Sequence, residues 1–283
     1  MLTRLANQLR HPVALCICSF LCFFFLALLL NLPLTPLSIW IEQLARQQQL
    51  ELQMDDPEVI FPLGLGVEKL EIGSAQIPHP PLLLTELALY PLWTTLASND
   101  PGVSFSLKAL QGQIDGIAFR SGKVTAEFSG LQINETLGPQ LPLTISGQLD
   151  KGEFDGTLPL QGRNKSRMQV SMSRLLLTGL QKFGVSDDIL PLGRLHCSIE
   201  ATGQTLNIIA LEISGSALTL LGSGTLRLGP TAARSLVNLE LTLTPQAALD
   251  PTLKDMLSLL HKPQADGNYQ LRLTGTLTNT RIK

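Results

Sequence analysis

The sequence is poor in charged and aromatic side chains. Charged residues make up 16% of the chain and aromatic residues 5%, whereas hydrophobic residues make up 44%. A net charge of −2 and a pI near 6.1 argue against a nucleic-acid partner, which would require a basic face. The composition therefore favours extended apolar surface over polar chemistry, and we expect no nucleic acid among the partners.

Cysteine and catalytic motifs are also scarce. Three of the four cysteines fall within one apolar run, so Cys197 has no partner for an internal disulfide and is expected to be a buried, small hydrophobic residue. The chain has no Gly-x-Ser-x-Gly elbow, phosphate-binding loop, Gly-x-Gly-x-x-Gly or His-Glu-x-x-His motif. We therefore predict a protein that is not an enzyme, with no catalytic, cofactor-binding or metal-binding residues.

The residues that come nearest to a metal site are explained by ordinary structure. His196 and Cys197 are neighbours in a predicted strand, so their side chains point to opposite faces and do not share one metal ion. Asp150, Glu153 and Asp155 lack the acidic residues at the third and fifth positions that a calcium loop requires. We interpret this acidic cluster as a solvated hairpin turn.

The one long apolar run, Val13 to Leu30, contains no charge, glycine or proline. It is about 18 residues long and would form about 27 Å of helix, close to the hydrocarbon thickness of a bilayer. A cleaved signal peptide would have a shorter apolar run followed by small residues, and none follows Leu30. We therefore predict a transmembrane signal anchor over residues 13–32, represented by Val13, Phe20, Phe24 and Leu30.

The flanks of this run predict its orientation. Arg4 and Arg10 precede it with no acidic residue among residues 1–12, and the first charge after it is Glu42. By the positive-inside rule, residues 1–12 form a cytoplasmic tail and the rest of the chain lies across the membrane. The expected location is the bacterial inner membrane, with a single pass and the main domain in the periplasm.

A juxtamembrane amphipathic helix is predicted over residues 33–50. Thr35 and Pro36 are typical of a helix start, with Thr as N-cap and Pro in the first turn. Its apolar residues follow at helical spacing: Leu37, Trp40, Ile41 and Leu44. Two placements fit this helix: on the lipid interface with Trp40 as its anchor, or at the end of the following domain.

From residue 51 onward the hydrophobic period changes from helical to two, which predicts antiparallel strands with one apolar face. We expect a bulge near Ala109, where the parity of the apolar residues changes, and turns at Ser121-Gly122, Asp150-Lys151-Gly152 and Thr202-Gly203-Gln204. Two short helices are expected, over about Ser173 to Phe183 before Gly184 and about Pro251 to His261 behind Asp250 as N-cap.

The predicted fold class is therefore mainly β. An N-terminal transmembrane helix and an amphipathic helix are followed, over residues 51–283, by a curved antiparallel sheet in the form of a groove or roll with two short helices. The candidate apolar groove consists of Leu143, Ile145, Leu218, Leu220, Leu226, Leu271 and Leu273.

Three stretches carry a resemblance to a known family: Leu110 to Ile114, Gly215 to Leu226 and Gly267 to Leu277. With the anchor and the sheet, they resemble the N protein (GspN) family of the type II secretion system, and the ending is also similar to AsmA-like envelope proteins. The first resemblance implies a non-catalytic inner-membrane accessory subunit whose partners are other secretion subunits. The second implies an apolar groove that binds or transfers lipid.

Overall fold

The structure is a computed structural model that describes residues 50–283 apart from 62, 75–81, 96–97, 137–142, 186, 230, 261, 278 and 283. The predicted tail, transmembrane anchor and named residues of the juxtamembrane helix lie outside the described residues and stay predictions. Among the residues that are described, no helix is long and apolar enough to cross a membrane. This part of the chain is mainly β, as predicted, and divides into two compact units with a boundary between Pro91 and Leu92.

The first unit contains an antiparallel meander of β1 (Leu50–Ile60), β2 (Gly64–Ser74) and β3 (Leu82–Pro91). Strands β1 and β2 are paired along their whole length, from Ile60 and Gly64 to Leu50 and Ser74. Val67 is only 2% exposed, and the cross-strand neighbours Leu70 and Leu84 are also buried. These are the buried apolar side chains of the meander.

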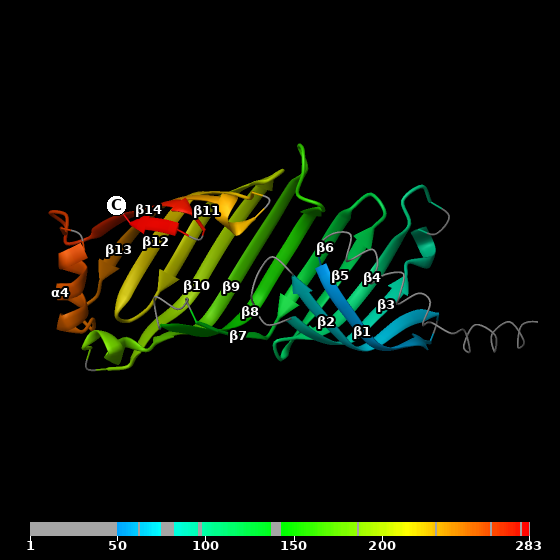
Figure 1. The fold of residues 1–283 in the computed structure, drawn as a ribbon, viewed down its shortest axis with the longest axis horizontal. Helices are drawn as coiled ribbons and strands as arrows, with labels where there is room; N and C mark the ends of the chain where they lie inside the picture. The colour runs from blue at the N-terminus through cyan, green and yellow to red at the C-terminus, as the bar shows by residue number, and fades with distance from the viewer. Residues whose placement is uncertain are drawn as a thin grey trace, which may run out of the picture. The chain divides into compact units, whose positions relative to one another are not determined.

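The second unit is a curved antiparallel sheet in which sequential strands lie side by side (Figure 1). Its strands are β4 (Gly102–Ala109), β5 (Gly112–Phe119), β6 (Lys123–Ser129), β8 (Thr144–Thr157), β9 (Lys165–Thr178), β10 (Ile189–Thr202), β11 (Thr205–Ser214), β12 (Leu218–Arg227), β13 (Leu236–Pro245), β14 (Tyr269–Thr276) and β15 (Asn279–Ile282). Strand β7 (Leu131–Thr136) pairs with the first half of β8, while β6 pairs with its second half.

Short helices occupy some of the connections. Three are 3-10 helices: η1 (Trp93–Thr95), η2 (Leu180–Phe183) and η3 (Ala232–Arg234). The predicted helix behind Asp250 is confirmed as α4 (Pro251–Leu260), and it is the one α-helix within the described ranges. The Oδ1 atom of Asp250 accepts a hydrogen bond of 2.7 Å from the N–H of Thr252, which is the N-cap contact expected there.

The helix predicted over Ser173 to Phe183 is wrong. Strand β9 runs to Thr178, and only η2 is helical. Arg174 has a φ of 52°, and the pairing of β8 with β9 is irregular nearby. This irregularity puts Met172 and Leu175 on the same face, where both lie within 3.3 Å of a Cβ built on Gly147. Apolar residues three apart in a distorted strand therefore imitated helical spacing.

The predicted turn at 150–152 and the predicted bulge near Ala109 are also wrong. At 150–152 the chain does not turn, because β8 continues to Thr157 and a register irregularity after Leu149 leaves both Asp150 and Lys151 exposed. Near Ala109 there is a hairpin instead of a bulge, since Leu110 and Gln111 have φ values of 47° and 66° and form its two-residue turn. A turn and a bulge both shift the parity of apolar residues, so the pattern alone did not separate them.

Strand β11 was not predicted, because its apolar pattern is interrupted. Ile208 pairs with Ile199 and Ala210 pairs with Ser198, which leaves Ile209 as an extra residue that is 56% exposed. Leu206 and Ile208 therefore precede the bulge, and Leu211 and Ile213 follow it on the same face. The turn before this strand, at Gly203-Gln204, lies where it was predicted.

Candidate functional site

The predicted apolar face exists and is continuous across the C-terminal strands of the second unit. Its residues face one another in cross-strand rows. The rows across β12, β13 and β14 are Leu220, Leu243 and Tyr269; Gly222, Leu241 and Leu271; Gly224, Leu239 and Leu273; and Leu226, Val237 and Gly275. The glycines make room for their neighbours: a Cβ built on Gly222 would lie 2.6 Å from the Leu241 Cδ2 atom.

One end of this face is closed. It is the end at which η2, residues 246–250 and α4 connect the strands, and η2 and α4 lie at the left of Figure 1. Leu180 and Val185, in the connection after β9, are each 4% exposed, and Leu249, before α4, is 7% exposed. They are joined there by buried residues of the strands: Leu175, Leu190, Leu192, Leu218, Leu243 and Tyr269. This end therefore holds the buried part of the apolar face of the C-terminal strands.

Towards the other end of the strands, the apolar face is only half-buried. Leu226, Val237 and Leu273 are of intermediate exposure, and Leu277, which follows β14, is 47% exposed. Full burial of a leucine contributes roughly 1.5 to 3 kcal/mol, and a half-exposed one forfeits about half of that amount. The open end is therefore the part of the face that would gain most from a covering ligand or partner.

The candidate groove residues differ in burial. Leu218 is buried at the closed end. The others are half-buried: Leu143 directly before β8, Ile145 in β8, Leu220 and Leu226 in β12, and Leu271 and Leu273 in β14. Sequence reasoning missed the four apolar residues of β11, because the bulge at Ile209 interrupts their alternation.

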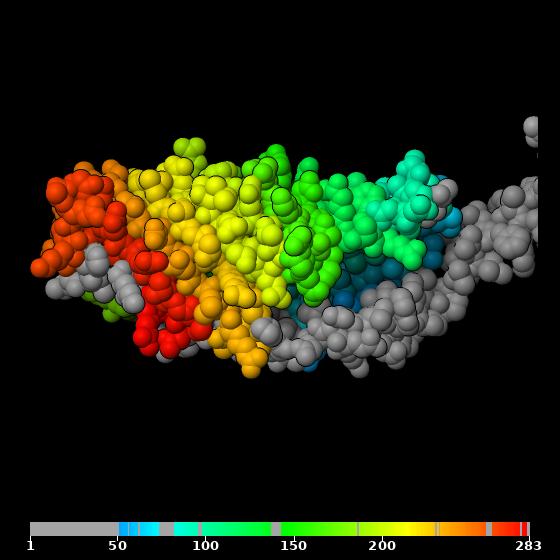
Figure 2. All heavy atoms as spheres, turned by 90° about the horizontal axis from the view of Figure 1, so that it is seen from above, coloured from blue at the N-terminus to red at the C-terminus, as the bar shows by residue number. Residues whose placement is uncertain are grey.

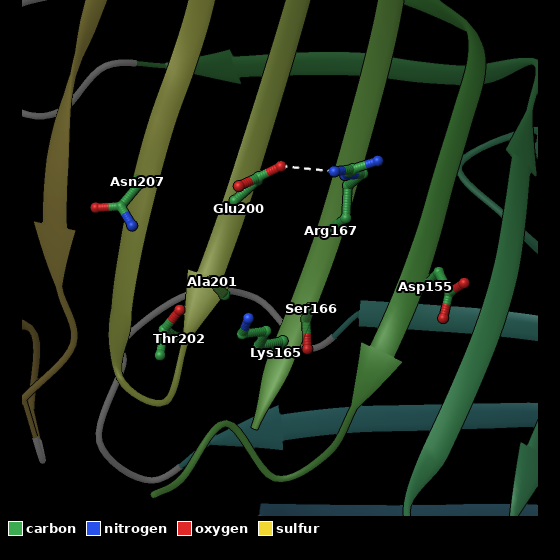
Figure 3. A pocket seen from close by; sticks show the side chains of 8 residues that line it. All are labelled: Asp155, Lys165, Ser166, Arg167, Glu200, Ala201, Thr202 and Asn207. Carbon is green, nitrogen blue, oxygen red and sulfur yellow. Dashed lines mark hydrogen bonds and ion pairs between the residues drawn. The ribbon is translucent and has the colours of Figure 1, made fainter. Parts of the chain in front are cut away.

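A shallow cleft of about 420 Å³ lies on the other face, between β8 and β11 (Figure 3). Arg167 and Glu200 cross it with an ion pair of 2.7 Å between Nη2 and Oε1, while Lys165, Asp155 and Asn207 line it nearby. The two side chains of the ion pair are 64% and 49% exposed, so the pair contributes at most about 1 kcal/mol to stability. The cleft offers a polar surface for a small polar group.

The predicted separation of His196 from Cys197 agrees with their exposure. His196 is exposed, and its Nδ1 atom lies 3.2 Å from the hydroxyl oxygen of Ser171. Cys197 is half-buried on the apolar side, and burial raises the pKa of its thiol. In the part of the chain that the structure describes, no three His, Cys, Asp or Glu side chains form a group that could hold a metal ion.

The acidic cluster at 150–155 lies in β8 and not in a turn. The Oδ1 atom of Asp150 accepts a hydrogen bond of 2.8 Å from the hydroxyl of Ser173, and Glu153 forms an ion pair with Lys151. The hydrogen bond and charge of Glu153 raise the pKa of Lys151. Asp150 and Glu153 therefore each have a partner of their own, while Asp155 lines the polar cleft.

Strand β7 presents a sheet edge that sequence reasoning did not single out. Its inner edge pairs with β8, and across the described ranges no other strand pairs with it. The N–H of Gln132 points away from β8, because it donates a hydrogen bond of 2.8 Å to the Leu110 carbonyl. Backbone groups alternate along a strand, so those of Asn134 and Thr136 also point outward. Gln132, Asn134, Glu135 and Thr136 are exposed.

Comparison with known proteins identifies no relative: no family model, no curated protein and no solved structure matches the chain.

Proposed function

We propose that this protein is a non-catalytic accessory subunit of the type II secretion system. It is anchored in the bacterial inner membrane and acts in the periplasm in the assembly of the machine or the export of folded proteins. The proposal is supported by the resemblance of three stretches, which fall at the β4 to β5 turn, in and before β12, and in and before β14. Its partners are other subunits of the same machine.

The observation that carries this proposal is the outer edge of β7. An accessory subunit needs a surface to which other subunits can attach, and a strand edge binds an extended segment through main-chain hydrogen bonds. The outward backbone groups of Asn134 and Thr136 provide such an edge, and the polar side chains of β7 keep it soluble before a partner arrives.

The test is the export of secretion-system substrates in a strain from which the gene is deleted. We expect export to fall and the wild-type gene to restore it. In the variant Asn134→Pro, the outward N–H is lost but the bonds between β7 and β8 are kept, because the N–H of Asn134 does not point to β8. This variant should restore export poorly.

The matched control is Asn134→Ala, which removes the same side chain but keeps the backbone N–H, and it should restore export fully. Cellular levels of the two variants are compared so that instability is not mistaken for loss of docking. Unchanged export in the deletion strain would refute the proposed function. Full restoration by Asn134→Pro would refute the role of the β7 edge.

A second candidate function is binding or transfer of lipid by the apolar face, as in AsmA-like proteins. The observation that favours it is the half-buried open end around Leu226, Leu239 and Leu273, which offers acyl chains a continuous aliphatic surface. Lipid extraction from the natively purified full chain tests this candidate. Co-purifying lipid that is lost from a Leu226→Asp/Leu273→Asp variant would support it, and lipid-free wild-type protein would count against it.

A further inference from the structure

Basic side chains gather at one end of the strands in the second unit. Arg120, Arg163 and Arg234 lie in three connections at this end, which join β5 to β6, β8 to β9 and β12 to β13. Lys123, Lys165 and Arg227 are the strand residues that border the same connections. All six are exposed. We call these six residues the basic rim. It lies opposite the closed end of the apolar face, along the upper edge of the sheet in Figure 1, and Figure 2 looks down on it.

Topology explains why residues so distant in sequence lie together. In an antiparallel meander, every second connection falls at the same end of the sheet, and the pairing confirms this here. Lys123 faces Thr157 at the end of β8, Lys165 faces Thr202 at the end of β10, and Arg227 faces Thr205 at the start of β11. The rim therefore extends across the width of the sheet from β5 to β13.

Opposing charge beside the basic rim is limited to three carboxylates. Asp155 and Glu200 lie two residues inside the ends of β8 and β10, in the cleft that Lys165 also lines. Asp100 is the one acidic residue in the described connections at this end. Both of its carboxylate oxygens are engaged by Ser121, at 2.8 Å to the N–H and 2.9 Å to the hydroxyl. The connections at the closed end are mixed instead, with Lys182, Asp187, Asp188, Asp250, Lys254, Asp255, Lys262 and Asp266. Although the chain has a net charge of −2, one end of the sheet is therefore strongly positive.

Large apolar side chains are exposed among these charges. Trp93 is 53% exposed in η1, and it belongs to this end because the N–H of Leu92 donates to the Gly102 carbonyl at 2.9 Å. Leu158 follows β8 and is 43% exposed, while Leu236 at the start of β13 and Leu277 after β14 are 50% and 47% exposed. Tryptophan and leucine between arginines and lysines are typical of surfaces that insert into a lipid interface.

We propose that the basic rim docks onto the surface of a bilayer that contains anionic phospholipid. The lysines and arginines attract the negative headgroups, and Trp93, Leu158, Leu236 and Leu277 enter the interface. An acidic protein or a nucleic acid would satisfy the charges but would leave these apolar side chains without a partner. The basic rim is a different surface from the β7 edge, and its docking does not depend on the secretion role.

The experiment uses the full chain, kept soluble in a non-ionic amphipol that covers the apolar N-terminal run. The chain has two tryptophans, so the variant Trp40→Phe leaves Trp93 as the only one. Vesicles of brominated phosphatidylcholine, with or without about 30% phosphatidylglycerol, are titrated in, and quenching of Trp93 reports its contact with lipid. We expect quenching by the anionic vesicles, none by the neutral ones, and loss of quenching at high salt.

The rim variant is Arg163→Gln/Arg227→Gln/Arg234→Gln in the Trp40→Phe background. Each basic residue near an anionic surface strengthens binding roughly five-fold, so this variant should bind about a hundred-fold more weakly. The matched control, Lys182→Gln/Lys254→Gln/Lys262→Gln, changes the net charge equally at the closed end and should bind within about two-fold of the parent.

Three results would overturn the proposal: equal binding to neutral vesicles, equal binding by the two triple variants, or binding to soluble polyglutamate or DNA without binding to vesicles. If the rim variant does not fold, as judged by its circular dichroism, the salt and lipid dependence of the parent decide the outcome by themselves.

Discussion

The substitutions Gly156→Ala and Ser166→Gly, made singly and together, would test the pairing of β8 with β9. These two residues face each other across the strands, and a Cβ built on Gly156 would overlap the side chain of Ser166 and lie 2.8 Å from its Cα atom. Such overpacking costs about 1 to 3 kcal/mol. Gly156→Ala also lowers the entropy of the unfolded chain, which offsets about 0.4 to 1 kcal/mol. We expect a net destabilisation of up to about 2.6 kcal/mol, in the upper part of the range because one of the overlapping atoms belongs to the backbone.

Ser166→Gly alone should cost a similar amount for a different reason. The hydroxyl of Ser166 accepts a hydrogen bond of 3.1 Å from the N–H of Thr157, and losing that bond costs about 1 kcal/mol. Glycine within a strand costs about 0.5 to 1 kcal/mol more. In the double variant, the new methyl group occupies the space that the serine left. Its destabilisation should therefore be smaller than the sum of the two single effects by about 1 to 2 kcal/mol.

The assay is native-state hydrogen exchange of peptides from β8 and β9, since a chain with two compact units need not unfold in one step. Gly73→Ala, followed in peptides from β1 and β2, serves as the control, because the nearest atom to a Cβ at that strand position, Glu51 Cβ, lies 3.5 Å away, in ordinary contact. Effects of Gly156→Ala and Ser166→Gly that add within about 0.5 kcal/mol would refute the reasoning, because the two residues would then not face each other.

Three further predictions follow from burial and capping. Leu243→Ala should destabilise β13 by about 2 to 5 kcal/mol in hydrogen exchange, since Leu243 is only 7% exposed at the closed end. Leu221→Ala, at a residue that is 51% exposed, should cost less than about 1 kcal/mol. Equal effects of the two substitutions would contradict the burial at the closed end. Asp250→Ala should lower protection of the first turn of α4 by about 1 kcal/mol, while Asp255→Ala within the helix should not. Burial raises the pKa of the Cys197 thiol above its usual value of 9.0, so the folded chain keeps this proton at pH values where the unfolded chain has lost it. Unfolding free energy should therefore fall as pH rises above about 9, and this fall should be shallower in Cys197→Ala; superimposable pH profiles would contradict the burial of the thiol.

Strands with strict alternation could be predicted from the sequence. In β12 and β13, apolar residues occupy every second position, and the structure pairs them in one face as expected. The helix at Pro251 was also predictable, because Asp250 is a strong local capping signal that acts within its own turn. In these cases the information lies within a few residues of the element.

The bulges were not predictable in the same way. The left-handed backbone at Arg174 and the extra residue at Ile209 are set by how each strand fits two neighbours, and no single residue type encodes that fit. The bulge at Asp150 shifts the alternation of apolar residues by one position, as a turn also would. The sequence Asp-Lys-Gly is typical of a turn, and a turn was therefore predicted.

The basic rim illustrates a different limit. Its members form three pairs that are each close in sequence, around residues 120, 163 and 227, but the pairs themselves are about 40 to 60 residues apart along the chain. The up-and-down order of the strands brings them to one end, so the rim can be seen once the connections are assigned to the two ends of the sheet. The closed end was not predictable for the same reason. It is covered by residues of the connections, since Leu180, Val185 and Leu249 are buried there, and sequence alone does not show that these connections lie against the sheet.

The most direct test of the proposed secretion role is photo-crosslinking in living cells, with a photoreactive residue at Asn134 on the β7 edge or at Leu273 on the open end of the apolar face. The account predicts that Asn134 crosslinks to another subunit of the secretion machine, identified by mass spectrometry, and that this adduct disappears when the partner gene is deleted. Absence of any protein adduct at Asn134, together with lipid adducts at Leu273, would contradict the account and would favour a lipid-binding protein.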